Sequence, residues 1–202
     1  MTPTGASKQK CTFNGSRYKE SHFFKFSFMI TIISGTNRPR SNARVISDIY
    51  ARLLDKREMP NQILDLMDLP ADFIFTALYH NAGKNDQYNE LNKLIESTDK
   101  FVFIVPEYNA SFPGVLKAFI DGLSYPGSFK NKKAALVGIS TGSQGGALAL
   151  SHLTDILHYM GMHVLAAKPR LNYISKNLAN GELTNPLYES LLLEQIDSFI
   201  NF

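Results

Sequence analysis

The alternation of short apolar runs with longer segments of helical period, which begins at Met29 and continues to the C-terminus, constrains the fold most. An unbroken apolar run such as FVFIV is typical of a strand buried on both faces of a sheet. The intervening segments place apolar residues at i, i+3, i+4 and i+7, so that one helix face can pack on the sheet. This alternation predicts βα units and a parallel sheet. Strands are expected at 29–34, 62–66, 101–105, 134–139 and about 163–166, and helices up to about 57, at 86–97, from about 113, at 143–160 and at 185–200.

Five strands and five helices in this order fit a flavodoxin-like α/β fold, a three-layer α/β/α sandwich around a five-stranded parallel sheet of order 2-1-3-4-5. The run at 62–66 alternates polar and apolar residues, which suits an edge strand. In such sheets ligands bind beyond the carboxyl ends of strands one and three, so the loops after those strands are the expected site. Residues 67–85 follow no single period and contain several aromatic residues, and we expect them to form a lid or a subunit contact.

Composition suits an ordinary globular domain and excludes several classes of function. Of the 202 residues 44% are hydrophobic and 19% are charged, and no apolar run approaches the roughly 20 residues of a membrane-spanning helix. The single cysteine, Cys11, allows neither an internal disulfide nor a thiolate metal site, so a reducing, cytoplasmic location is expected. His, Asp and Glu show no metal-site spacing, and we expect no bound metal.

The net charge of +3 arises in the first 28 residues. They contain five of the 21 basic residues and one of the 18 acidic residues, which leaves 16 basic and 17 acidic residues in the rest of the chain. Because basic and acidic residues are nearly equal in number after residue 28, this part of the chain offers no positively charged surface to a phosphate backbone. We therefore expect neither a nucleic-acid nor a membrane partner. Residues 1–28 also lack helical or strand periodicity, and we expect a disordered leader, with Met29 as the true start of a single domain over 29–202. A targeting peptide is the alternative, because the stretch is basic and poor in acidic residues.

The first candidate loop, SGTNRPRSNAR over residues 34–44, joins a buried strand to a helix. Its hydroxyls, amide and guanidinium, together with free backbone N–H groups at a helix N-terminus, suit a terminal phosphate monoester. A solvated turn, with a serine as the helix N-cap and two exposed arginines, is an equally good interpretation of this loop alone. The side chains concerned are Ser34, Thr36, Arg38, Ser41 and Asn42.

Two further loops follow expected strands. In PEYNASFPG, residues 106–114, prolines at both ends make a rigid loop that can turn its backbone amides toward a planar ring. In GISTGSQGG, residues 138–146, glycines allow close backbone approach to a ligand, and Ser140 and Thr141 can cap or bind. Ordinary turns are the alternative for each loop, but three such loops at one sheet edge are far rarer by chance than one.

These loops resemble the motifs of the NAD(P)H-dependent FMN reductase family of flavodoxin-like proteins, which also contains azo-dye, quinone and chromate reductases. The similarity extends from Met29 to the C-terminus, and the PEYN stretch is its most specific part. The family's GSxRxxSxN is matched at Gly35, Thr36, Arg38 and Ser41, with Asn42 one place nearer than that spacing implies; PEYNxSxPGxLKxxID is matched at 106–109, Ser111, Pro113, Gly114, Leu116, Lys117, Ile120 and Asp121; and GxSxGxxGG is matched at Gly138, Ser140, Gly142, Gly145 and Gly146.

The resemblance implies bound FMN as cofactor, NADPH or NADH as co-substrate, and a homodimer or homotetramer. It places the FMN phosphate at residues 36–42 with Arg38 as charge partner, the isoalloxazine edge at residues 107–109, and the pyrimidine and ribityl side near residues 140–146. The expected cofactor-binding residues are Ser34, Thr36, Arg38, Ser41, Asn42, Pro106, Glu107, Tyr108, Asn109, Ser111, Ser140, Thr141, Gly142 and Gly145.

The expected function is an oxidoreductase that passes hydride from NAD(P)H to FMN and then to a small-molecule electron acceptor, such as a flavin, quinone, azo compound or metal oxyanion. No catalytic side chain is expected, because the flavin performs the chemistry; His80, His152 and His158 are expected to be packed or solvated. The alternatives are an electron-carrier flavodoxin that does not oxidise NAD(P)H and a non-enzymatic FMN-binding module. Arg38 and the nearly neutral core argue against the carrier, because such carriers usually have a phosphate loop without arginine and an acidic surface.

Overall fold

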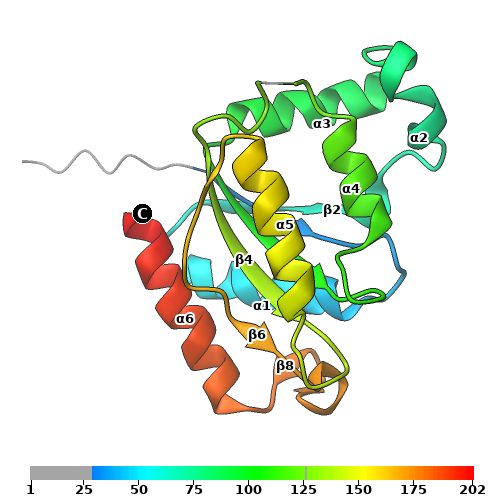
Figure 1. Cartoon of the computed structure of the whole chain (residues 1–202). Helices are drawn as coiled ribbons and strands as arrows, with labels where there is room; N and C mark the ends of the chain where they lie inside the picture. Colours follow the sequence, from blue (N-terminus) through cyan, green and yellow to red (C-terminus); the bar gives the residue numbers. More distant parts are fainter. Residues whose placement is uncertain (1–28, 126) are drawn as a thin grey trace, which may run out of the picture.

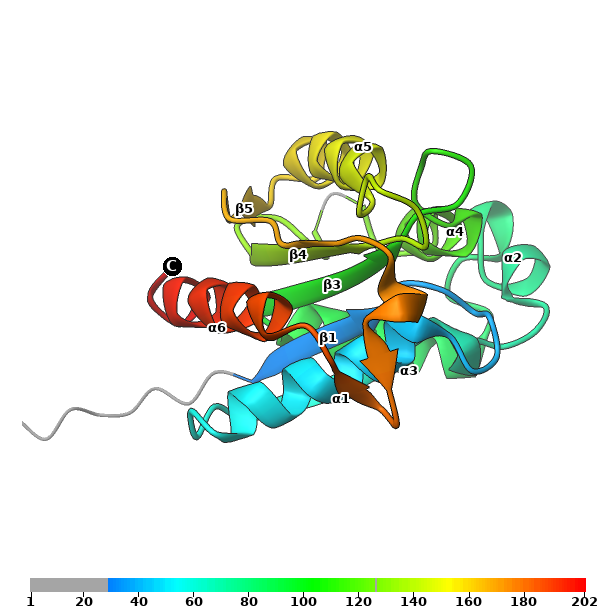
Figure 2. The same ribbon diagram turned by 90° about the horizontal axis from the view of Figure 1, so that it is seen from below.

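The apolar runs of the sequence lie side by side in one parallel sheet, with helices on both faces (Figures 1 and 2). The structure is a computed structural model that describes residues 29–125 and 127–202, so the expected leader lies outside the described residues. The strand order β2-β1-β3-β4-β5 confirms the predicted order, with β2 at one edge. The principal elements are β1 (Ile30–Ser34), α1 (Asn42–Asp55), β2 (Asn61–Asp65), α3 (Asp86–Ser97), β3 (Lys100–Pro106), α4 (Gly114–Asp121), β4 (Lys133–Ile139), α5 (Ala147–Tyr159), β5 (His163–Val164), β6 (Arg170–Leu171) and α6 (Pro186–Asn201).

Short elements fill the rest of the described chain. The aperiodic stretch 67–85 contains the four-residue helix α2 (Phe73–Thr76) between two 3₁₀ turns, η1 (Leu66–Asp68) and η2 (Tyr79–Asn81). After β6 come η3 (Ile174–Lys176) and a hairpin of β7 (Leu178–Ala179) and β8 (Glu182–Leu183), which the sequence pattern did not predict. No helix in the described ranges is long and apolar enough to cross a membrane.

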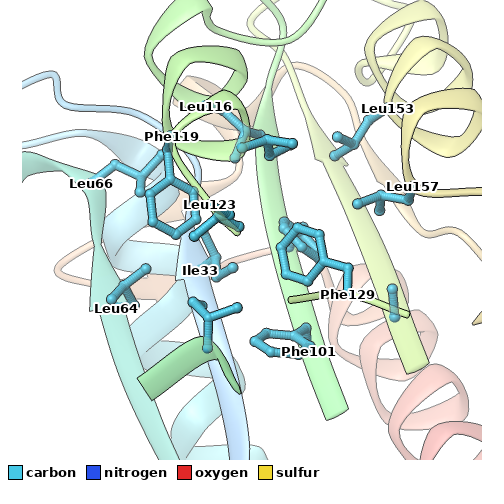
Figure 3. Close-up of a cluster of buried hydrophobic side chains, with 14 of the residues drawn as sticks. Ile33, Leu64, Leu66, Phe101, Leu116, Phe119, Leu123, Phe129, Leu153 and Leu157 are labelled. Atoms are coloured by element: carbon cyan, nitrogen blue, oxygen red, sulfur yellow. The ribbon is translucent and has the colours of Figure 1, made fainter. Parts of the chain in front are cut away.

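Side chains that alternate along the central strands form two cores, one on each face of the sheet. Phe101, Phe103 and Val105 of β3 pack beneath α3, α4 and α5, whereas Val102 and Ile104 face α1 and α6. Figure 2 shows α4 and α5 on one side of the sheet and α1 and α6 on the other. Figure 3 shows the first core, in which Leu116 of α4 and Leu153 and Leu157 of α5 approach the aromatic rings over β3. Burial on both faces explains why these strands read as unbroken apolar runs.

The fifth strand position is divided between two short strands, where the sequence predicts one run at about 163–166. β5 pairs with the start of β4, and β6 pairs with its end. Between them the Gln195 side chain of α6 bridges β4 and the segment beside it: its Nε2 donates to the carbonyls of Leu136 and Ala167, both at 2.9 Å. The Gln195 Oε1 accepts a hydrogen bond from the Tyr50 hydroxyl at 3.1 Å, and burial raises the pKa of this phenol. The division of the fifth strand therefore leaves β4 paired up to its end, directly before the third candidate loop.

Candidate functional site

A cavity of about 500 Å³ lies beyond the carboxyl ends of β1, β3 and β4. Its walls come from all three loops singled out in the sequence, which we call loop 1 (residues 34–44), loop 2 (106–114) and loop 3 (138–146). The parallel sheet explains this convergence, because every β-to-α loop of such a sheet emerges at the same edge.

Loop 1 provides a cradle for an anion at the start of the 14-residue helix α1. Ser41 is the N-cap, and its Oγ accepts the Arg44 N–H at 3.1 Å. The N–H groups of Ser41, Asn42 and Ala43, in contrast, have no acceptor within the described chain. Unpaired N–H groups and the helix dipole both favour negative charge here.

Side chains of loop 1 add to this cradle. Arg38 and Arg40 are exposed and form no ion pair with any described residue. A phosphate monoester suits such guanidinium donors. Ser34 is fully buried and does not line the cavity, although its Oγ has no hydrogen-bond partner among the described residues. The two interpretations of this loop from the sequence are therefore compatible: Ser41 caps the helix, and unpaired N–H groups remain that could bind an anion.

Loop 2 contains a tight turn in which some backbone N–H groups form hydrogen bonds within the fold and others remain unpaired. Tyr108 and Ser111 exchange two backbone hydrogen bonds, at 2.8 and 3.0 Å, and Asn109 and Ala110 between them have φ values of 51° and 60°. Positive φ at both central residues defines a type I′ turn. The Glu107 N–H donates to the Ile139 carbonyl at 2.9 Å. Of the residues expected to hold the ring edge, Glu107 and Tyr108 thus use their N–H groups in the fold, and Asn109 keeps its own.

A side-chain hydrogen bond joins loop 2 to loop 1. The Tyr108 hydroxyl lies 2.9 Å from Thr36 Oγ1, which also accepts the Arg38 N–H at 3.3 Å. Thr36 is fully buried, whereas Tyr108 is 36% exposed. This bond links the anion cradle to the loop beside it.

Loop 3 is held in shape by its own serine. Ser140 Oγ donates to the Gly142 carbonyl and accepts the Gly145 N–H, both at 3.0 Å. The N–H groups of Thr141, Gly142 and Ser143 keep no acceptor in the described chain. The close packing needs glycine at Gly138, because a Cβ there would lie 2.3 Å from the Gly145 carbonyl oxygen. Loop 3 therefore presents backbone donors from a rigid base.

Comparison with a protein-family model identifies the family of this chain. The model for NADPH-dependent FMN reductase matches residues 28–171, which contain all three loops. The chain belongs to the NADPH-dependent FMN reductase family. As an FMN reductase it uses FMN as cofactor and NAD(P)H as reductant.

Individual relatives of this FMN reductase agree with the assignment. An NAD(P)H-dependent FMN reductase of Pseudomonas aeruginosa is 29% identical over 143 residues, which are 69% of this chain and 77% of that protein. A 2-hydroxy-1,4-benzoquinone reductase of a Burkholderia species is 37% identical over 98 residues, 45% of this chain and 52% of that protein. Among solved structures, the NAD(P)H:(acceptor) oxidoreductase FerB of Paracoccus denitrificans matches with a TM-score of 0.72 and 26% identity, and the match covers 86% of this chain and 96% of that one.

Most of the residues expected to bind FMN line the cavity: Thr36, Arg38, Ser41, Asn42, Pro106, Glu107, Tyr108, Ser140 and Thr141. Ser34, Asn109, Ser111, Gly142 and Gly145 do not line it, although all five lie in the three loops. Asn109 instead lines a neighbouring cavity of about 510 Å³ together with Arg38, Glu107 and Tyr108. The contact of each residue with FMN stays a prediction.

Two further lining residues, Ile174 and Ser175 of η3, were not predicted from the sequence. They reach the cavity because the Tyr173 and Ile174 N–H groups donate to the carbonyls of Gly142 and Ser140, at 3.0 and 2.9 Å. Their segment follows β6, carries no motif and has no strong period, so only these tertiary hydrogen bonds reveal its position.

Replacing Arg38 by alanine should weaken FMN binding at least about tenfold without loss of the fold, because an exposed guanidinium at the anion cradle can form charge-assisted hydrogen bonds to phosphate. Titration of the apoprotein with FMN, followed by quenching of flavin fluorescence, measures the change. Arg52→Ala is the matched control, because Arg52 is an exposed arginine in the last turn of α1, away from loop 1, and pairs with Glu182 at 2.8 Å. Riboflavin, which lacks the phosphate, should bind wild type poorly and should not discriminate between wild type and Arg38→Ala. Equal FMN affinity in both proteins would exclude Arg38 from the site.

Proposed function

We propose that this FMN reductase holds the FMN phosphate at the start of α1 and the flavin ring between loops 2 and 3, and that it passes electrons from NAD(P)H to quinones. When bound, FMN supplies a group that accepts hydride and then donates it. The chain's own part is to neutralise the phosphate, to orient the ring and to leave one face of it accessible.

The observation that carries this proposal is the pair of adjoining cavities. Both are lined by Arg38, Glu107 and Tyr108, and the second is wide open to solvent. A cofactor in the first cavity would therefore have an open space beside it, large enough for a nicotinamide or a quinone ring to enter in turn. The quinone is favoured over the other acceptors because a benzoquinone reductase is among the relatives.

A visible spectrum of the purified protein, followed by anaerobic addition of NADPH and then of 1,4-benzoquinone, tests the proposal. We expect flavin absorbance, bleaching by NADPH and recovery with the quinone. A colourless protein that takes up no FMN would favour a non-enzymatic module that has kept the fold and lost the flavin, and a yellow protein that NADPH does not bleach would favour the electron carrier or an FMN-binding module. FMN, an azo dye and chromate, each in place of the quinone, rank the remaining acceptors.

We also propose that two copies associate through the groove between α4 and α5. This groove, with a volume of about 550 Å³, is lined by apolar side chains that include Ile120, Ile156 and Met160. At its end the rings of Tyr125 and Tyr159 stack with centroids 6.5 Å apart, although these side chains are 67% and 77% exposed. Exposed aromatic rings beside an apolar groove suit an interaction site. In a two-fold dimer the same surface of each copy faces the other.

Tyr159→Lys should therefore convert a dimer into monomers in light scattering, because two buried lysines would repel across the two-fold axis. Tyr79→Lys is the matched control, because Tyr79 is also 77% exposed but lies in η2, within the stretch 67–85. If Tyr79→Lys separates the copies and Tyr159→Lys does not, the subunit contact lies at 67–85. A cytoplasmic location, proposed from the cysteine usage, is tested by cell fractionation.

A further inference from the structure

A serine and a histidine from different elements form a hydrogen bond beside loop 2. Ser111 Oγ lies 3.0 Å from Nδ1 of His152, which belongs to α5. The two residues are 41 positions apart, so the contact is tertiary. His152 is exposed, and its ring can exchange protons with water.

The turn in loop 2 places Ser111 next to a residue that lines both cavities, although neither Ser111 nor His152 lines them itself. Ser111 lies directly opposite Tyr108 across the turn, and residues that exchange two backbone hydrogen bonds have Cα atoms about 5.5 Å apart. Tyr108 lines both cavities. Neither Asn109 nor Ala110 is a glycine, yet both have positive φ, which costs free energy and is often found at functional sites. The turn thus holds the Ser111 hydroxyl close to where a second substrate would enter.

Quinone reduction requires a proton at this position. NAD(P)H, one proton and a quinone give NAD(P)⁺ and a hydroquinone, so the hydride that reaches the quinone must be matched by a proton at its oxygen. We propose that Ser111 and His152 deliver this proton. The Ser111 hydroxyl gives its hydrogen to the quinone oxygen as it takes the Nδ1 proton of His152, and His152 is then protonated again from solvent. This proposal rests on the proposed quinone reductase function.

Histidine is the side chain best suited to this task near neutral pH. The serine hydroxyl alone cannot supply a net proton, but it can relay one. The other ionisable groups near the pair are less suited than His152 to supply the proton. Asp155 lies one turn further along α5, Lys117 and Asp121 of α4 are paired with each other at 2.6 Å, and Glu107 lies in loop 2 itself. Of these groups only Glu107 lines the cavities, and His152 is the one bonded to Ser111.

The two half-reactions can be measured separately by anaerobic stopped flow in wild type, Ser111→Ala and His152→Ala. His152→Ala changes no residue expected to bind FMN, and NADPH should bleach its flavin at the wild-type rate, because the pair acts on the acceptor; Ser111→Ala is compared after saturation with FMN. Reoxidation by 1,4-benzoquinone above pH 7 should slow about 10²-fold in either variant, the usual contribution of a positioned proton donor. Ferricyanide accepts electrons without a proton, and it should reoxidise the variants at the wild-type rate. Imidazole in solution should partly restore quinone reduction in His152→Ala.

His158→Ala, which removes an exposed histidine from the same helix, is the control and should behave as wild type. Ser111→Thr keeps the hydroxyl and should retain most of the quinone rate. Loss of the ferricyanide rate together with the quinone rate would show a merely structural role and overturn the proposal, as would an unchanged quinone rate in both alanine variants. A wild-type protein that NADPH fails to bleach would instead refute the proposed function itself.

Discussion

Reduction of bound FMN by NADPH should slow by about 10²- to 10³-fold when Gly142 is replaced by proline, the loss typical of removing one donor from a site of developing negative charge. A reduced flavin bound here would carry negative charge on the pyrimidine end of its ring, which backbone donors would stabilise. Loop 3 offers the unpaired N–H groups of Thr141, Gly142 and Ser143 close to the start of α5, where the helix dipole also favours that charge. Proline at position 142 removes one of these donors.

Gly142→Ala separates loss of the N–H group from any effect of added bulk. A Cβ at this position would meet no atom within 4 Å, so alanine should leave the rate near that of wild type. Anaerobic stopped-flow bleaching of variants that retain FMN provides the measurement. Glu107→Gln, His152→Ala and His158→Ala should also be reduced at near-normal rates, because charge stabilisation here requires donors and no base. If Glu107→Gln or either histidine variant stops bleaching while FMN stays bound, a side-chain acid or base takes part and the mechanism is wrong.

Replacing Gln195 by leucine should lower the free energy of unfolding by about 2 to 5 kcal/mol, because unpaired buried polar groups typically cost about 1 to 3 kcal/mol each. Gln195 is 1% exposed and serves three partners: the carbonyls of Leu136 and Ala167 and the hydroxyl of Tyr50. Leucine fills similar space but satisfies none of them. The Tyr50 phenol, whose pKa is raised by burial, would stay protonated and lose its acceptor.

Urea denaturation should show this loss as a lower midpoint with an unchanged slope. Glu194→Gln, at the exposed neighbouring position, should change the free energy of unfolding little. A loss below about 1 kcal/mol in Gln195→Leu would mean that water or a shifted strand satisfies the two carbonyls.

Periodicity in the sequence predicts the central sheet well because burial on both faces leaves a strong apolar signal. The helix α3 (Asp86–Ser97) agrees with the expected range 86–97, and β3 and β4 each extend the expected run by a residue or more. The divided fifth strand could not be predicted, because its gap is filled by Gln195, about 30 residues further along the chain. Strands of two residues, such as those of the β7–β8 hairpin, are too short to show a period.

The site likewise contains residues that the sequence predicts and residues that it does not. Residues carried by motif loops, such as Arg38 and Tyr108, line the cavity as expected. Ile174 and Ser175 reach it through backbone hydrogen bonds that most residue types can form, so the sequence pattern does not reveal them. His152 was expected to be packed or solvated, since a lone histidine on a helix has no motif; its partner Ser111 becomes visible only when loop 2 and α5 are placed side by side.

The type I′ turn of loop 2 also limits how this enzyme can evolve. Its central positions, Asn109 and Ala110, both require positive φ, which asparagine, aspartate and glycine adopt far more easily than other residues. The neighbouring N–H groups of Glu107 and Tyr108 already form hydrogen bonds within the fold. A changed preference for the electron acceptor can therefore arise in this loop mainly at positions 109 and 110, where few residue types are permitted. Libraries for altered acceptor range would therefore do better to vary Ser175 of η3, which has no positive φ, than Arg40 of loop 1, whose φ is 53°.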